Sequence, residues 1–281
     1  MNVAGVGAGV GAAVCWGAAD FGGGYASRSA TPLGTVVISQ IAGLAAASVV
    51  VAVVGEPMPS QLALAWACLA GTIGLAALLC LYRALATHAM GPVSAIATIV
   101  GVAIPVVVGA LTGDRLRVTD MLGIACAVVA IVLVTRPRGG LHIDRGGVAL
   151  ALLAGLGAGG FFVFMGQCTA AGGGTWWPLI FNRAVPVVVA LGVIAARRQA
   201  AATARSASPL MALIGVIDMT GVAFFLFANA QGALSLAAVL SSQYPAVTTI
   251  LARVVLHQRL APVHLAGMAV ALVGIALIAV P

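Results

Sequence analysis

Long apolar segments follow one another along almost the whole chain, with short polar connections between them. Each segment is long enough for a helix to cross a bilayer, which takes about 20 residues. The pattern predicts an all-α integral membrane protein with ten transmembrane helices. The predicted spans are residues 3–27, 33–54, 62–86, 91–112, 118–135, 146–168, 175–196, 210–232, 234–256 and 262–280.

The composition supports this prediction and excludes a soluble domain. Hydrophobic residues make up 62% of the chain and charged residues 7%, whereas soluble domains carry about 25% charged residues. We expect no cleaved signal peptide, because no basic residue precedes Arg28 and nine more apolar spans follow the first. The chain is expected to be a multi-pass protein of the cytoplasmic membrane.

The basic residues indicate how the chain is threaded. All of them are arginines, and most lie on odd-numbered connections, whereas Arg115 and Arg117 lie on an even-numbered one. The positive-inside rule would place the odd-numbered connections in the cytoplasm and both termini outside. The net charge of +7 is thus a topology signal, and no nucleic-acid partner is expected.

Cysteine and histidine residues point to no cofactor. The five cysteines are single residues within apolar spans, and the four histidines lie at span ends or in connections. This spacing favours neither a metal site nor a disulfide framework. The chain has no nucleophile paired with a base and no phosphate-binding loop, so we expect neither an enzyme nor an ATP-driven pump.

An internal repeat divides the chain into two halves. Residues 113–134 match residues 257–278, and both copies carry an Arg-Leu pair followed by a glycine eight residues after the arginine. We expect five helices in each half, with boundaries at 1–138 and 139–281. A five-helix unit ends on the opposite side of the membrane from its start, so the second half should be inverted relative to the first.

Three charged residues lie deep inside predicted spans, away from the span ends: Asp20, Arg183 and Asp218. Such a group costs several kcal/mol at membrane depth unless it is paired or faces water, so it indicates an ion or substrate pathway. Helical rise places both acids about 10–12 Å below the arginine-rich side, and Arg183 about 18 Å below it. A buried Arg183–Asp218 pair that only fixes helix register is the alternative, and both interpretations stay open here.

Further pathway candidates are aromatic or polar. Trp16 precedes Asp20 by one helical turn and could form a wall of a substrate site. Gln40, Asn182 and Gln243, which precedes Tyr244, would contact a substrate or join helices. Prolines inside spans free backbone carbonyls and predict helix kinks; these are Pro105, Pro186 and Pro245.

Several motifs resemble the ten-helix EamA-type members of the drug/metabolite transporter superfamily. The resemblance implies a ten-helix transporter. Such relatives are usually drawn with both termini in the cytoplasm, which is opposite to the orientation that the positive-inside rule gives for this chain. The family's Leu-Gly-Glu-Arg-Leu motif corresponds to 112–116 and 256–260, and the second copy has no acid. The other matching motifs are Trp16-Gly17 with Asp20-Phe21 and Gly23, Ser39-Gln40, Tyr82-Arg83-Ala84-Leu85, Gly91-Pro92-Val93-Ser94, Leu240-Ser241-Ser242-Gln243-Tyr244-Pro245 and Ala252-Arg253-Val254-Val255-Leu256.

We therefore expect a secondary transporter, more specifically an exporter, of a small metabolite, amino acid or drug-like compound. Proton coupling through Asp20 or Asp218 is a hypothesis that follows from their depth. The expected partners are the lipid bilayer, the substrate and protons, and a monomer and a homodimer both stay open. The alternative is a non-transporting membrane scaffold or small channel in which the charges are structural.

Overall fold

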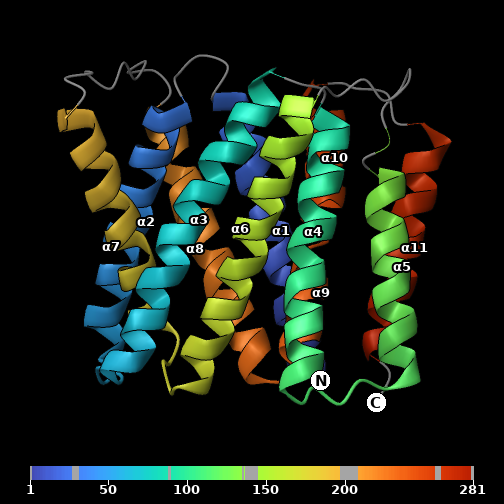
Figure 1. Ribbon diagram of the computed structural model, residues 1–281, viewed down its shortest axis with the longest axis horizontal. Helices are drawn as coiled ribbons and strands as arrows, with labels where there is room; N and C mark the ends of the chain where they lie inside the picture. The colour runs from blue at the N-terminus through green and yellow to red at the C-terminus, as the bar shows by residue number, and fades with distance from the viewer. Residues whose placement is uncertain are drawn as a thin grey trace.

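The structure is a computed structural model, and it describes residues 2–26, 32–87, 90–134, 136, 145–196, 208–256 and 261–279. These residues form helices joined by short connections and contain no strand (Figure 1). The helices are α1 (Val3–Ala26), α2 (Pro32–Val54), α3 (Gln61–Thr87), α4 (Met90–Thr112), α5 (Val118–Val134), α6 (Arg145–Ala170), α7 (Trp176–Ala196), α8 (Ser208–Ala230), α9 (Leu234–Ser241), α10 (Tyr244–Leu256) and α11 (Pro262–Ala279).

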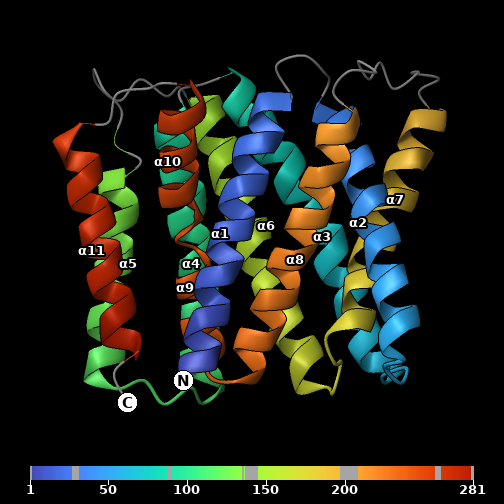
Figure 2. The same ribbon diagram turned by 180° about the vertical axis from the view of Figure 1, so that it is seen from behind.

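The ten predicted spans are confirmed, and their bounds agree to within a few residues. Six described segments are long and apolar enough to cross a membrane by themselves, and the four remaining spans are shorter apolar helices. Both termini lie at one end of the bundle, which we call the terminal end (Figures 1 and 2). An even number of crossings is what this placement requires.

The ninth span differs from the prediction because it consists of two helices, α9 and α10. Backbone N–H groups of Ser242 and Gln243 turn back to the carbonyls of Ala238 and Leu240 and end α9. Pro245 is the second residue of α10, a position where proline's missing N–H costs little. The span is thus interrupted just before the proline, and Pro245 lies in the first turn of α10 instead of inside one continuous helix. Pro105 and Pro186 lie inside α4 and α7, where kinks stay a prediction.

Helix packing follows the two-fold pattern of an inverted repeat. Exchanging each helix of the first half with its counterpart in the second, with α9 and α10 counted as one span, maps the contacts onto one another. The α3 to α6 contact becomes α8 to α1, and the α2 to α8 contact becomes α7 to α3. The α2 to α7 and α5 to α11 contacts map onto themselves. The predicted boundary at 138/139 lies outside the described residues and stays a prediction.

The repeated glycine shows the same symmetry at the level of single residues. A Cβ on Gly123 of α5 would lie 2.6 Å from the side chain of Ile278 on α11. Its repeat partner, Gly267 of α11, would meet Val134 of α5 at 2.8 Å. Val134 and Ile278 are themselves repeat partners, so the two contacts are related by the pseudo-two-fold. The glycine pair lets the last helices of the halves approach closely.

A close helix crossing at Gly71 provides a stability prediction. A Cβ at Gly71 of α3 would collide with the backbone carbonyl of Asn182 on α7. Overpacking of this kind typically costs about 1–3 kcal/mol, so Gly71→Ala should lower the thermal unfolding midpoint of the detergent-solubilised protein. Gly7→Ala is the matched control, because nothing lies within 4 Å of its Cβ position. Equal midpoints for the two variants would contradict the packing of α3 on α7.

Candidate functional site

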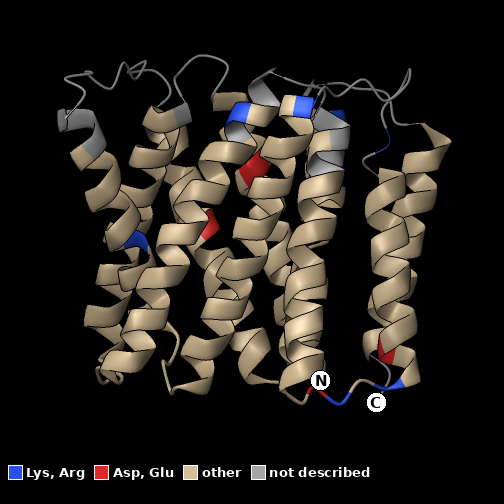
Figure 3. Cartoon of the chain, in the orientation of Figure 1, with Lys and Arg blue, Asp and Glu red and all other residues tan. Residues whose placement is uncertain are grey.

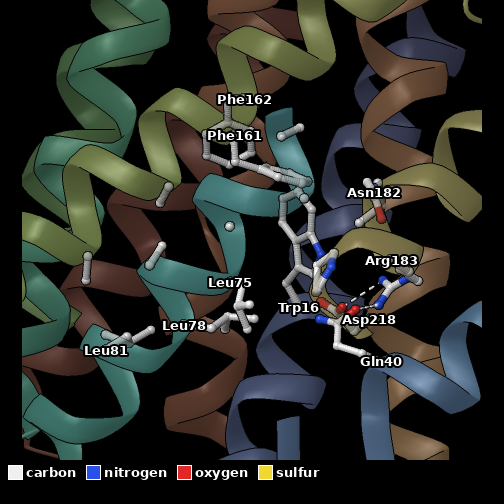
Figure 4. Close-up of a pocket in the computed structure, with 18 of the residues that line it drawn as sticks. Trp16, Gln40, Leu75, Leu78, Leu81, Phe161, Phe162, Asn182, Arg183 and Asp218 are labelled. Carbon is white, nitrogen blue, oxygen red and sulfur yellow. Dashed lines mark hydrogen bonds and ion pairs between the residues drawn. The ribbon is translucent and has the colours of Figure 1, made fainter. Parts of the chain in front are cut away.

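A cavity lies between the two halves, near the middle of the bundle. Its volume is about 150 Å³, the size of an engineered apolar cavity that binds benzene. Side chains from α1, α2, α3, α4, α6, α7, α8 and α10 line it (Figure 4). Most of the wall is apolar, formed by residues such as Leu75, Leu78, Leu81, Phe161 and Phe162.

All three charged residues predicted at membrane depth reach this cavity. Asp20 of α1, Arg183 of α7 and Asp218 of α8 are among its lining residues. Figure 3 shows how few charged residues lie between the ends of the helices. The fold thus brings together groups that lie up to about 200 residues apart in the sequence. This is the arrangement expected for a midplane site between inverted repeats.

Arg183 is held by partners from both halves. Its side chain is 2% exposed. One guanidinium Nη donates to Gln40 Oε1 at 2.8 Å, and the other donates to Asp218 Oδ2 at 2.8 Å. Gly43 of α2 provides the space for the Arg183 side chain, since a Cβ at this position would lie 3.0 Å from the guanidinium. The Nε group is buried without a hydrogen-bond partner among the described residues.

Asp20 differs from Asp218 because it has no partner. Within the part of the chain that the structure describes, its carboxylate makes neither a hydrogen bond nor an ion pair, although the residue is half-buried. Arg183 is already neutralised by Asp218. The described lining therefore contains one acid more than it has bases, and Asp20 is the group available for a proton or a ligand.

Trp16 forms an aromatic wall beside the charged groups. Its ring centroid lies 5.6 Å from that of Phe162, 6.1 Å from Phe225 and 6.4 Å from Phe161. Gly221 of α8 is needed for this position, because a Cβ there would lie 2.7 Å from the indole ring. Trp16 lies between the phenylalanines and the Arg183–Asp218 pair (Figure 4). The site thus offers a stacking surface next to polar groups.

The other polar candidates have separate places. Tyr244 lines the cavity, and its hydroxyl lies 3.0 Å from Thr98 Oγ1. Asn182 also lines the cavity, and its Nδ2 donates to Met165 Sδ at 3.9 Å. Gln243 is not among the lining residues, because its Nε2 donates to the Val239 carbonyl at the end of α9.

Several lining residues were not singled out from the sequence. Of the three prolines predicted to kink spans, Pro186 lines the cavity, and Leu75, Leu78 and Phe162 form much of its wall. Nothing in a uniformly apolar segment separates a residue facing a cavity from one facing lipid. Among the described residues no group of His, Cys, Asp and Glu could hold a metal ion.

The cavity extends toward the end opposite the termini. Trp16 and Asp20 lie in the second half of α1, and the lining residues of α3 run from Ala70 to Leu81. Both helices run away from the terminal end (Figures 1 and 2). The buried cluster around Trp16 and Phe225 packs between the cavity and the terminal end. The cavity therefore lies nearer the opposite end.

Ten spans in two inverted halves around a midplane cavity are the plan of many secondary transporters. The chain belongs to the EamA-like transporter family, whose model matches residues 3–136 and 145–280, one match in each half. The resemblance to the drug/metabolite transporter superfamily is thereby confirmed.

A solved structure described as "Crystal structure of protein" has a similar fold. Its TM-score is 0.78, and the match covers 99% of this chain and 97% of that one at 16% sequence identity. This similarity supports the fold alone. A comparison with curated proteins finds no match.

Proposed function

We propose that this protein is a secondary transporter that exports a small metabolite, amino acid or drug-like compound across the cytoplasmic membrane. The observation that carries the proposal is the cavity between the inverted halves, with the unpartnered carboxylate of Asp20 in its wall. A cavity of about 150 Å³ suits a small compound.

The lining suggests how a substrate would be held. Trp16 and Phe161 present aromatic faces to an apolar part of the substrate. The ion pair of Arg183 and Asp218 supplies a fixed polar wall, and Asn182 adds an amide. In this proposal the two halves move against each other and expose the cavity to one side of the membrane at a time.

Asp20 is the group that we propose couples transport to protons. The other charged or titratable groups lining the cavity are already engaged: Asp218 with Arg183, and Tyr244 with Thr98. A carboxylate that alternates between a protonated and an ionised form must be free of a permanent partner, and Asp20 meets this requirement.

A non-transporting scaffold is the second candidate, favoured by the Arg183–Asp218 pair alone. A neutralised pair of this kind can fix helix register without any substrate. It does not account for an acid that stays unpaired beside a cavity, so we favour transport.

Uptake by proteoliposomes tests the proposed function. Purified protein should accumulate at least one compound of a panel of amino acids, amines and small drugs, and a pH gradient should change the amount accumulated. Protein-free liposomes are the control. If no member of a broad panel crosses faster than in the control, with or without the gradient, the scaffold interpretation is favoured.

A further inference from the structure

A carboxylate from the first half caps a helix of the second half at the terminal end. Glu56, in the connection between α2 and α3, accepts hydrogen bonds from the backbone N–H groups of Thr175, Trp176 and Trp177 at 3.0, 2.9 and 3.1 Å. The Trp177 indole N–H donates to the Glu56 carbonyl at 2.8 Å. These N–H groups open α7 and have no partner within the helix. The negative charge also complements the positive end of the helix dipole.

Asp114 does the same for α9. It lies in the connection between α4 and α5, and its Oδ2 accepts from the backbone N–H of Ser235 at 3.0 Å and from Ser235 Oγ at 2.6 Å. The residue at the N-cap position of α9, Ala233, provides no side-chain cap. Asp114 therefore substitutes for a local cap from 121 residues away. It is also the acid of the motif at 112–116, to which the proposed pathway assigns no role.

The two caps lie at one end of the molecule only. The connections carrying Glu56 and Asp114 are at the terminal end (Figure 1). Shifted by the repeat, these connections correspond to residues within 197–207 and 257–260, and neither stretch contains an acidic residue. The inverted copy thus cannot supply equivalent carboxylate caps at the opposite end. This asymmetry agrees with a cavity that extends toward that opposite end.

We propose that Glu56 and Asp114 form a latch that holds the protein closed at its terminal end. This end opens to the cavity only when the carboxylates release α7 and α9. The latch joins the first half to the second at two places, so relative movement of the halves at this end must break its hydrogen bonds. Its purpose rests on the proposed transport function, whereas its existence can be tested without any substrate.

Labelling of a cysteine in the cavity tests the latch. The reporter is Ala158→Cys, on the cavity-lining face of α6, in a protein whose native cysteines are replaced by alanine. A membrane-impermeant maleimide is applied to one face or the other of oriented membrane vesicles. With the latch intact, labelling should occur from one side only. In Glu56→Gln/Asp114→Asn, labelling from the other side should rise several-fold.

Asp120→Asn is the matched control. Asp120 is an acid at the same end, but its ion pair with Arg117 at 2.9 Å is local to the start of α5 and does not join the two halves. This variant should label from one side only, as the protein with the intact latch does. The single variants Glu56→Gln and Asp114→Asn should give intermediate labelling, and they carry the test if the double variant does not fold.

The latch is overturned if the Glu56 and Asp114 variants fold and label from one side only. It is equally overturned if Asp120→Asn opens the second side as far as they do. Labelling requires no transported compound, so a protein that transports nothing could still pass this test. Conversely, a protein that transports in proteoliposomes but shows no latch would leave the proposed function standing.

Discussion

Asp218→Asn should destabilise the protein by about 3–5 kcal/mol, as expected when one partner of a buried ion pair is removed. The substitution keeps the shape of the side chain but leaves the Arg183 guanidinium, 2% exposed, with an uncompensated charge. Because the Asp218 side chain is 30% exposed, water in the cavity should bring the loss toward the lower end of this range. The measurement is thermal or denaturant unfolding of the purified protein in detergent.

Two further variants show that the charge is responsible. Arg183→Met should cost less than Asp218→Asn, because Asp218 retains access to water in the cavity. The double variant Arg183→Met/Asp218→Asn should recover part of the lost stability, since no unpaired charge remains. If Asp218→Asn unfolds at the wild-type temperature, the pair does not support the fold in the way described.

Asp20→Asn should abolish accumulation driven by a pH gradient while leaving substrate exchange intact. The substitution removes the titrating group and keeps the shape. Since the carboxylate has no hydrogen-bond or ion-pair partner among the described residues, stability should change little. The measurement is uptake and exchange of the compound identified in proteoliposomes, with and without a pH gradient.

The contrast between the two acids is the control for this experiment. Asp218→Asn should lose stability, whereas Asp20→Asn should lose only the response to protons. If Asp20→Asn accumulates substrate in response to the gradient as the wild type does, Asp20 is not the coupling group. Asp20 would then have a packing role.

The helices and the inverted repeat could be predicted because their signals lie in local composition and in a fixed offset. Apolar length predicts a span wherever the chain must satisfy its backbone within one segment. The repeat was visible in Arg115-Leu116 and Gly123, and the structure explains that glycine by the close approach of α5 and α11. The grouping of Asp20, Arg183 and Asp218 followed from their depth in the spans.

Long-range features could not be predicted in the same way. The interruption after Ser241 lies in a short polar stretch, Ser241-Ser242-Gln243, of a span that is apolar overall. Hydropathy taken over the whole span does not register the local turns that satisfy its backbone groups. The partners of Glu56 lie about 120 residues away in α7, so its role depends on the assembled fold. Leu69 and Leu78 belong to the same apolar helix, yet Leu69 is 47% exposed on the surface and Leu78 lines the cavity.

This pair of leucines allows the most direct test of the central claim, that a substrate crosses the membrane through the cavity between the halves. Leu78→Trp should fill the cavity and stop proteoliposome uptake of the transported compound. Leu69→Trp places the same side chain on the outer surface of the same helix and should transport as the wild type does. If correctly folded Leu78→Trp transports as fast as Leu69→Trp, the cavity is not the pathway.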